Sequence, residues 1–431
     1  MGGGASHEEA SMVNVDEDGN LGIKESFLSF LMDAMDLDVK RPIVTKEHEA
    51  LIKANWVAVN KGTVAYDAAK HLSPTKFFYT TFYSLMFKEA PSIRPMFRSS
   101  MTVQGKVLAG IIGTMSTVIK SKNVVQVCQD LAARHTMFGA TKEHYNVMGL
   151  VLMKTLAIIS GPEWNEAVHE AYLTAYCFLY YLMLPVIMDK QPKPIKPSLP
   201  GKIAAKETIG DNTVRLSITM DFPLRYHAGD SILIGLPMHT GEVRRSYAIS
   251  SVYDPEVKPF DICVEATSES SKWLVEANVD SVVNVYWING GVHFETDTPD
   301  AIPKKLLFVS QGIGAAPFHA MIKGCQSVKD KWDGDIAALH VTSNPISAFQ
   351  TIHWDRFKIA TAKELSKDAL LSVAPDLSTR RLYIAGSSAF VDATKQLFLE
   401  AGGRAPEIEV YSFDNAPFIE ESLDVSPLPG H

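Results

Sequence analysis

The chain has 431 residues, of which 46% are hydrophobic and 21% charged, and its formal net charge is −8. This length predicts about two to four globular domains, and the acidic balance argues against nucleic acid as a partner. Four widely spaced cysteines argue against a disulfide framework or a structural zinc site and favour a reducing, cytoplasmic setting: Cys128, Cys177, Cys263 and Cys325.

The chain begins Met1-Gly2-Gly3-Gly4-Ala5-Ser6, which fits N-myristoylation at Gly2, with a glycine-rich disordered start as the alternative. One acyl chain would attach the protein only weakly to a membrane. No signal peptide is visible. The most apolar run, residues 171–188, contains Pro185 and is predicted to be a buried helix rather than a membrane span.

Residues 14–25 place oxygen-bearing side chains at the spacing of a calcium-binding loop. Positions one, three, five, seven and twelve are Asn14, Asp16, Asp18, Asn20 and Glu25, and Gly19 stands where the chain must turn. An apolar stretch follows as the exiting helix, so residues 1–44 resemble an EF-hand-like extension that would bind Ca²⁺ weakly. Asn14 in place of Asp is a departure, and a solvated acidic turn is the alternative.

Patterning divides the rest of the chain into five segments. Residues 45–190 are helical, and residues 191–200 form a proline-rich linker. Residues 201–300 hold short alternating strands. In residues 301–414 strands alternate with helices, which indicates a parallel sheet, and residues 415–431 form an acidic tail.

His135 lies in the helical segment on one predicted helix face with Leu131 and Cys128. A haem needs a neutral imidazole on a rigid helix, an apolar slot and a polar group on the distal side. A lone histidine on an amphipathic helix is more often a core or surface residue than a ligand. The interpretation of His135 therefore depends on its context.

Two motifs in residues 201–300 supply what a flavin-adenine dinucleotide needs. Arg245-Ser246-Tyr247-Ala248 offers a cation for the pyrophosphate and an aromatic face for the ring. Ser268–Leu274, which includes Ser271 and Trp273, could surround the phosphates with hydroxyl and amide groups. A β-barrel with an exposed arginine and a packed tyrosine is the alternative.

Gly312-Ile313-Gly314 follows an apolar strand, and Pro317 opens a helix, so the backbone could approach a dinucleotide pyrophosphate. The next strand ends in Ser343-Asn344 with no adjacent basic residue, which favours NADH over NADPH. A third strand ends at Gly386.

Over residues 45–414 these motifs resemble the flavohaemoglobins. The globin part of the resemblance rests on Ala132-Ala133-Arg134-His135, Glu143–Gly149, Phe82-Tyr83, Phe97 and Gln104. The resemblance implies an all-α globin, then an antiparallel β-barrel FAD domain, then an α/β parallel-sheet NAD domain.

The resemblance also implies roles for individual residues. His135 would bind the iron of haem b, Phe97 would pack on the ring, and Leu108 would shape the ligand pocket. Tyr83 and Gln104 would be the distal donors, and Tyr145 would hydrogen-bond near His135. FAD would contact Arg245, Ser246, Tyr247, Ala248, Ser271, Trp273 and Phe413, and NADH or NADPH would contact Gly312, Gly314, Pro317 and Gly386.

Several positions depart from the family pattern. Met183 stands where we expect a glutamate behind the proximal tyrosine, and the stretch 172–188 has no acid. The other departures are Ala248, Ser268, Ala316 and Ala385. Such changes would alter the flavin potential and slow hydride transfer.

The resemblance implies nitric oxide dioxygenation, with O₂ and nitric oxide as substrates and electrons passing from NAD(P)H through FAD to haem. We add the hypothesis that Ca²⁺ at residues 14–25 gates electron transfer. Two alternatives remain: a haem-based gas sensor with an inactive reductase, and a reductase of another acceptor. The sequence does not predict the oligomeric state.

Overall fold

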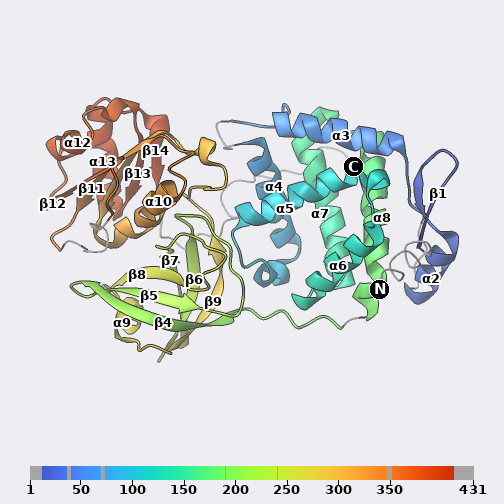
Figure 1. Ribbon diagram of the computed structural model, residues 1–431, viewed down its shortest axis with the longest axis horizontal. Coiled ribbons are helices and arrows are strands. Elements are labelled where there is room, and N and C mark those ends of the chain that lie inside the picture. Colours follow the sequence, from blue (N-terminus) through green and yellow to red (C-terminus); the bar gives the residue numbers. More distant parts are fainter. Residues whose placement is uncertain are drawn as a thin grey trace. The chain divides into compact units, whose positions relative to one another are not determined.

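The computed structural model describes residues 12–35, 40–68, 73–189, 191–239, 241–344, 346 and 352–411 (Figure 1). The chain divides into two compact units, and the boundary along the sequence falls between Lys196 and Pro197, inside the predicted linker. Residues 98–100 are grouped with the second unit. Gly2 and Phe413, and with them the predicted acylation site and one predicted flavin contact, lie outside the described residues.

The first unit is helical. Its helices are α3 (Lys46–Lys61), α4 (Pro74–Glu89), η1 (Pro91–Met96), α5 (Met101–Met115), η2 (Val118–Lys120), α6 (Val124–Met137), α7 (Lys142–Ser160), η3 (Gly161–Glu163) and α8 (Glu166–Asp189). Side-chain caps start two of them: Thr45 accepts from the His48 amide at α3, and Ser73 accepts from the Lys76 amide at α4. Lys142–Glu163 and Glu166–Asp189 are long and apolar enough to cross a membrane, but half or more of each window is buried in the unit, which is typical of core helices.

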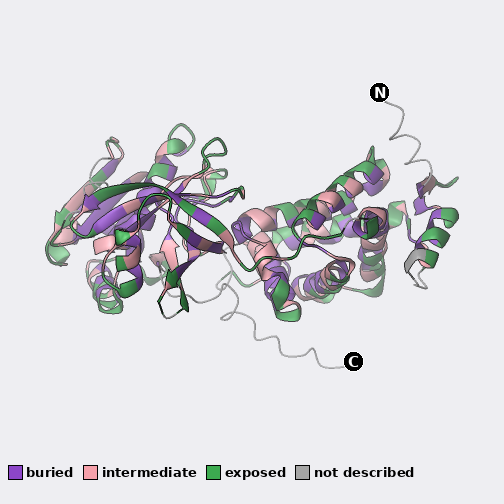
Figure 2. Ribbon diagram, turned by 90° about the horizontal axis from the view of Figure 1, so that it is seen from below, coloured by how far each residue is buried: buried purple, intermediate pink, exposed green. Residues whose placement is uncertain are grey.

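A small sheet precedes these helices and belongs to the same unit. Strands β1 (Val13–Val15), β2 (Leu21–Ile23) and β3 (Ile43–Val44) lie in the order β1-β2-β3, and helix α2 (Glu25–Met35) follows β2. Ile23 and Val44 of this extension are fully covered and Leu31 is 2% exposed, whereas Val15 and Phe30 are exposed. Figure 2 accordingly shows both buried and exposed stretches in this part of the chain. The extension therefore buries part of its apolar surface and is grouped with the helices in one compact unit.

The second unit begins with an antiparallel barrel. Its strands are β4 (Leu199–Gly210), β5 (Thr213–Thr219), β6 (Ser231–Met238), β7 (Gly241–Ala248), β8 (Phe260–Glu265) and β9 (Val282–Asn289), in the order β7-β6-β9-β4-β5-β8. A bridge between Ile249 and Ile262 joins the two edge strands, which closes the barrel. Helix α9 (Glu269–Glu276) follows β8.

A parallel sheet completes the second unit. Strands β10 (Lys305–Gln311), β11 (Asp335–Val341), β12 (Phe357–Ala362), β13 (Arg381–Ala385) and β14 (Ile408–Val410) lie in the order β12-β11-β10-β13-β14. Helix η4 (Pro299–Ala301) precedes β10, and the intervening helices include η5 (Gly312–Gly314), α10 (Ala315–Ser327), α12 (Lys367–Val373), η6 (Leu377–Thr379), α13 (Ser388–Glu400) and η7 (Ala405–Glu407). The predicted fold class is thus confirmed: a helical domain, then an antiparallel barrel, then a parallel α/β sheet.

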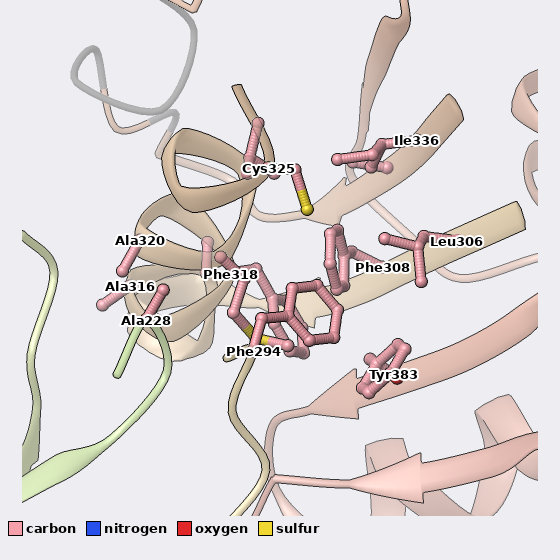
Figure 3. Close-up of a cluster of buried hydrophobic side chains, with 14 of the residues drawn as sticks. Ala228, Phe294, Leu306, Phe308, Ala316, Phe318, Ala320, Cys325, Ile336 and Tyr383 are labelled. Atoms are coloured by element: carbon pink, nitrogen blue, oxygen red, sulfur yellow. The ribbon is translucent and has the colours of Figure 1, made fainter. Parts of the chain in front are cut away.

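Helix α10 packs on this sheet through aromatic side chains (Figure 3). The rings of Phe308 on β10 and Phe318 on α10 stack with centroids 4.7 Å apart, and Phe294 and Tyr383 close the same cluster. Burying such rings provides much of the stabilisation of the core. This packing fixes α10 directly behind the glycine loop that ends β10.

Candidate functional site

His135 is held on α6 in the state that a haem iron requires. Its Nδ1 donates to the carbonyl oxygen of Leu131, one turn back, at 2.8 Å. That bond selects the tautomer with a bare Nε2, and no contact within the described residues occupies Nε2. Burial lowers the pKa of His135, so the imidazole is neutral and able to bind a metal.

An aromatic cluster lies behind His135. The Tyr145 ring on α7 meets the His135 ring edge to face, with centroids 6.0 Å apart, and stacks on Tyr180 at 5.6 Å. The α8 side chain that stacks on Tyr145 is therefore Tyr180, one turn before Met183. The Tyr145 hydroxyl is buried and has no hydrogen-bond partner among the described residues, and burial raises its pKa. Tyr145 thus contacts His135 and Tyr180 through its ring.

The predicted distal residues lie on two helices that cross closely. A Cβ added to Gly105 of α5 would lie 2.3 Å from the Tyr79 ring of α4, so the two backbones approach each other at this point. Gln104 adjoins the crossing, while Tyr83 on α4 and Leu108 on α5 lie one turn from it. Gln104 is half-buried, and no contact within the described residues engages its amide.

Tyr83 is buried in an aromatic group with Phe87 and Phe97. The Tyr83 and Phe97 rings are 5.5 Å apart, and the Phe87 and Phe97 rings are 5.4 Å apart. Burial raises the pKa of Tyr83, so its hydroxyl stays protonated and can donate. Tyr83 and Phe97 thus belong to one aromatic group, and Gln104 and Leu108 lie on helix α5. A haem with a gaseous ligand needs apolar surroundings and polar groups of these kinds.

The crossing gives a matched pair of variants on helix α5. Gly105→Ala is expected to destabilise the helical unit by about 2–3 kcal/mol, because the methyl group meets the base of the Tyr79 ring. Gly113→Ala meets nothing within 4 Å and is expected to stabilise the same helix by up to about 1 kcal/mol. Urea unfolding followed by circular dichroism measures both, and equal effects would contradict the close crossing.

One cavity of the second unit brings the predicted flavin and nicotinamide motifs together. It has a volume of about 230 Å³ and is lined by Arg245, Ser246, Tyr247, Ala248, Cys263, Val264, Glu265, Thr267, Ser268, Ser270, Ser271, Ile313 and Ala316. These residues come from the end of β7, the end of β8, the start of α9 and the glycine loop after β10. Burial raises the pKa of Tyr247 to about 12, so the phenol remains neutral beside the cavity.

Two serines that line the cavity, Ser268 and Ser271, also cap helix α9. Ser268 is the N-cap of α9: its Oγ accepts from the Ser271 amide at 3.2 Å, and the Ser271 Oγ accepts from the Ser268 amide at 2.9 Å. This reciprocal capping box explains why serine stands at position 268, where the family pattern has glycine. Trp273 packs partly buried on the barrel core instead and is not among the residues that line the cavity.

The glycine loop lies at the switch point of the parallel sheet, where successive connections leave β10 and β13 in opposite directions. Gly312 has a φ of +51°, and a Cβ on Gly314 would lie 2.7 Å from the Ala385 carbonyl oxygen. Gly386 sits against Gln311, whose Oε1 accepts from the Ser387 amide at 3.1 Å. Close backbone approach therefore requires glycine at 314, while Pro317 is buried in the first turn of α10.

Several residues that line the cavity were not predicted from the sequence, notably Cys263 and Glu265 on β8. Pairing of β8 with β5 turns these side chains toward the glycine loop, and that pairing joins segments about fifty residues apart. Their place in the sequence could have indicated them, because both precede the Ser268 motif by only a few residues, at the end of a predicted strand.

The predicted calcium loop has a different structure. Residues 13–15 and 21–23 form a β-hairpin whose turn is held by the Asp16 carboxylate, which accepts from the amides of Asp18 at 3.0 Å and Asn20 at 2.8 Å. These bonds lower the pKa of Asp16. The residues described contain no group of three or more His, Cys, Asp or Glu side chains able to hold a metal ion.

A guanidinium group joins the first and last predicted calcium ligands. Arg41 donates through Nη2 to Asn14 Oδ1 at 3.0 Å and through Nη1 to Glu25 Oε1 at 3.2 Å. Lys46 donates to the Asp18 carbonyl oxygen at 2.8 Å. The predicted Ca²⁺ site therefore has no support, because side-chain cations of the chain already engage its oxygens.

Comparison with known proteins identifies the helical unit. Residues 80–182 match the Globin family model, and this span contains Tyr83, Phe97, Gln104, His135 and Tyr145. The helical unit is a globin domain, and in globins a histidine holds the haem iron.

Curated relatives extend beyond the globin domain. A flavohemoprotein from a Burkholderia species is 22% identical over 298 residues, which cover 65% of this chain and 71% of the relative. A flavohemoprotein from Rhodopirellula baltica is 33% identical over 99 residues, or 21% of this chain and 24% of the relative. Among solved structures, a flavohemoglobin from Malassezia yamatoensis with bound FAD and heme covers 86% of this chain and 100% of its own, with 14% identity and a TM-score of 0.43.

Proposed function

We propose that the chain is a flavohaemoglobin: an NAD(P)H-dependent oxidoreductase with haem and FAD that converts nitric oxide and O₂ to nitrate. The observation that carries the proposal is the cavity that joins Arg245-Ser246-Tyr247 to Ile313 and Ala316, in a chain whose globin domain presents a bare histidine nitrogen. When bound, haem would supply the iron at which O₂ and nitric oxide react, and FAD would split the hydride of NAD(P)H into single electrons.

In the globin domain we assign a role to each residue that is predicted to surround the haem. His135 would hold the haem iron through Nε2, because the Leu131 carbonyl oxygen engages its other nitrogen. Phe97 and Leu108 exclude water from the apolar slot, and Tyr83 and Gln104 offer protons for hydrogen bonds to a polarised ligand. Tyr145 buttresses the imidazole by ring contact rather than by an acid, which leaves the proximal histidine less electron-donating.

In the second unit we assign FAD binding to the barrel and nicotinamide dinucleotide binding to the parallel sheet. Arg245 is the cation of the cavity and is suited to the flavin pyrophosphate. Tyr247 offers an aromatic face, and Gly312 and Gly314 let a nicotinamide dinucleotide approach the start of α10. Ala248 and Ala316 leave the flavin edge without the hydroxyls of the family pattern, so we expect slower hydride transfer than in the relatives.

The proposal is tested on the purified full chain supplied with haem and FAD. Adding NADH under carbon monoxide should bleach the flavin band and then give the ferrous carbon monoxide spectrum. With O₂ and nitric oxide, NADH should be consumed and nitrate formed. A chain that binds haem but no flavin would be a sensor instead, and faster NADH oxidation with another acceptor than with nitric oxide would identify a different reductase.

Tyr247→Ala tests the flavin site directly. We expect FAD per chain to fall about tenfold, equivalent to about 1.4 kcal/mol of binding, because the ring loses its aromatic partner. Tyr253→Ala is the control, since Tyr253 packs on the barrel core and on Tyr226 but does not line the cavity. Equal flavin loss in both variants would mean that barrel packing alone, and no specific contact, governs FAD content.

A further inference from the structure

Glu265 is a carboxylate in the cavity for which the proposed function gives no role. It is the last residue of β8, is partly buried, and lines the cavity beside the glycine loop. A Cβ placed on Gly312 would lie 3.6 Å from its Oε2. No ion pair or hydrogen bond within the described residues engages this carboxylate.

The two charged side chains that line the cavity come from different strands, β7 and β8. Of the residues that line it, Arg245 is the cation and Glu265 the anion. Arg245 comes from β7 and donates to the Arg244 carbonyl oxygen at 2.8 Å, whereas Glu265 faces the loop that precedes α10. A helix start of this kind attracts phosphate through its free amides and its dipole. A carboxylate against the same loop opposes that attraction.

We propose that Glu265 lowers the affinity of this cavity for the nicotinamide dinucleotide by repelling its pyrophosphate. This inference rests on the proposed function, since it assumes that the dinucleotide binds at Gly312–Gly314. The opposite role for a carboxylate is to accept hydrogen bonds from ribose hydroxyls, but such an acid follows the second strand of the nucleotide-binding sheet. Glu265 instead comes from the barrel and faces the pyrophosphate loop itself.

The size of the effect follows from Coulomb's law. A carboxylate about 5–6 Å from a phosphate in a partly solvated cavity is repelled by about 1 kcal/mol, or about fivefold in dissociation constant. Neutralising the charge with Glu265→Gln keeps the shape of the side chain and should remove that repulsion.

The test uses FAD-bound full chain and measures NAD⁺ binding by calorimetry at low and at high ionic strength. Glu265→Gln is expected to tighten NAD⁺ binding about fivefold at low salt, with a smaller gain at high salt because ions screen the repulsion. Glu256→Gln is the matched control, an exposed acid of the same barrel that does not line the cavity. FAD content and melting temperature, measured on each variant, report whether the barrel is intact.

The outcomes separate the two proposals. Unchanged binding in Glu265→Gln, with normal binding by the parent chain, overturns the inference and leaves the proposed function intact. Weaker binding overturns it as well and identifies Glu265 as a ribose ligand. A flavin-containing chain in which neither protein binds NAD⁺ or oxidises NADH overturns both.

Discussion

Replacing His135 with glycine is expected to reduce haem per chain by about tenfold or more, with loss of the Soret band. The His135 imidazole would supply the bond from the globin domain to the haem iron, and Leu131 holds it in the tautomer that this bond needs. The measurement is the ratio of Soret to protein absorbance after haem reconstitution. Added imidazole should restore part of the band, because it can enter the space left by the side chain.

His144→Gln is the control for this experiment. His144 is the N3 residue of α7, where its Nδ1 accepts from the Thr141 amide at 3.0 Å, and glutamine can serve the same capping box. This variant should keep its full haem content. If both variants bind haem as the parent does, another residue holds the iron and the assignment of His135 is wrong.

Acid should destabilise the second unit at pH values well above those at which ordinary carboxylates titrate. His319 and His340 lie in the core beside a small cavity of about 20 Å³, and burial lowers their pKa values to about 3 and about 4. In the unfolded chain both would take up protons near pH 6.5. Below that pH the unfolded state therefore binds more protons, so stability falls as the pH falls.

For His340 the loss amounts to roughly 3 kcal/mol between pH 6.5 and its folded pKa of about 4. His340→Asn should remove this dependence, because asparagine does not titrate but can still bond to Ser310 Oγ, now 3.0 Å from His340 Nδ1. Urea unfolding of both proteins between pH 7 and 4.5, written as free energy against pH, should give a shallower slope for the variant by about one proton. Parallel slopes would show that His340 is charged in the folded protein.

The sequence predicted the architecture well because its signals are local. Arg245-Ser246-Tyr247 and Gly312-Ile313-Gly314 each lie within one strand and the turn that follows, and the structure brings both to one cavity. Whether His135 binds haem could be judged only from the neighbouring motifs, because an amphipathic helix with one histidine is common in proteins without haem. The helical, alternating and strand–helix patterns gave the order of the three domains correctly.

What the sequence could not predict depends on contacts between distant segments. Glu265 enters the cavity because β8 pairs with β5, and Tyr180 meets Tyr145 because α8 packs beside α7. The spacing of residues 14–25 gave no indication of Arg41, which lies sixteen residues beyond Glu25 and pairs with it. Spacing identifies oxygens that could bind a cation, but it does not reveal that a cation of the same chain is already there.

The Arg41 contacts have a consequence for how the N-terminal extension responds to its surroundings. A calcium sensor binds and releases its ion as the ion concentration changes, whereas the Arg41 guanidinium is covalently part of the chain and cannot diffuse away. Arg41 thus joins Asn14 Oδ1 and Glu25 Oε1 through hydrogen bonds made by the chain itself. We therefore expect the extension to keep its structure without a bound divalent ion. Chelators added during purification should leave it folded.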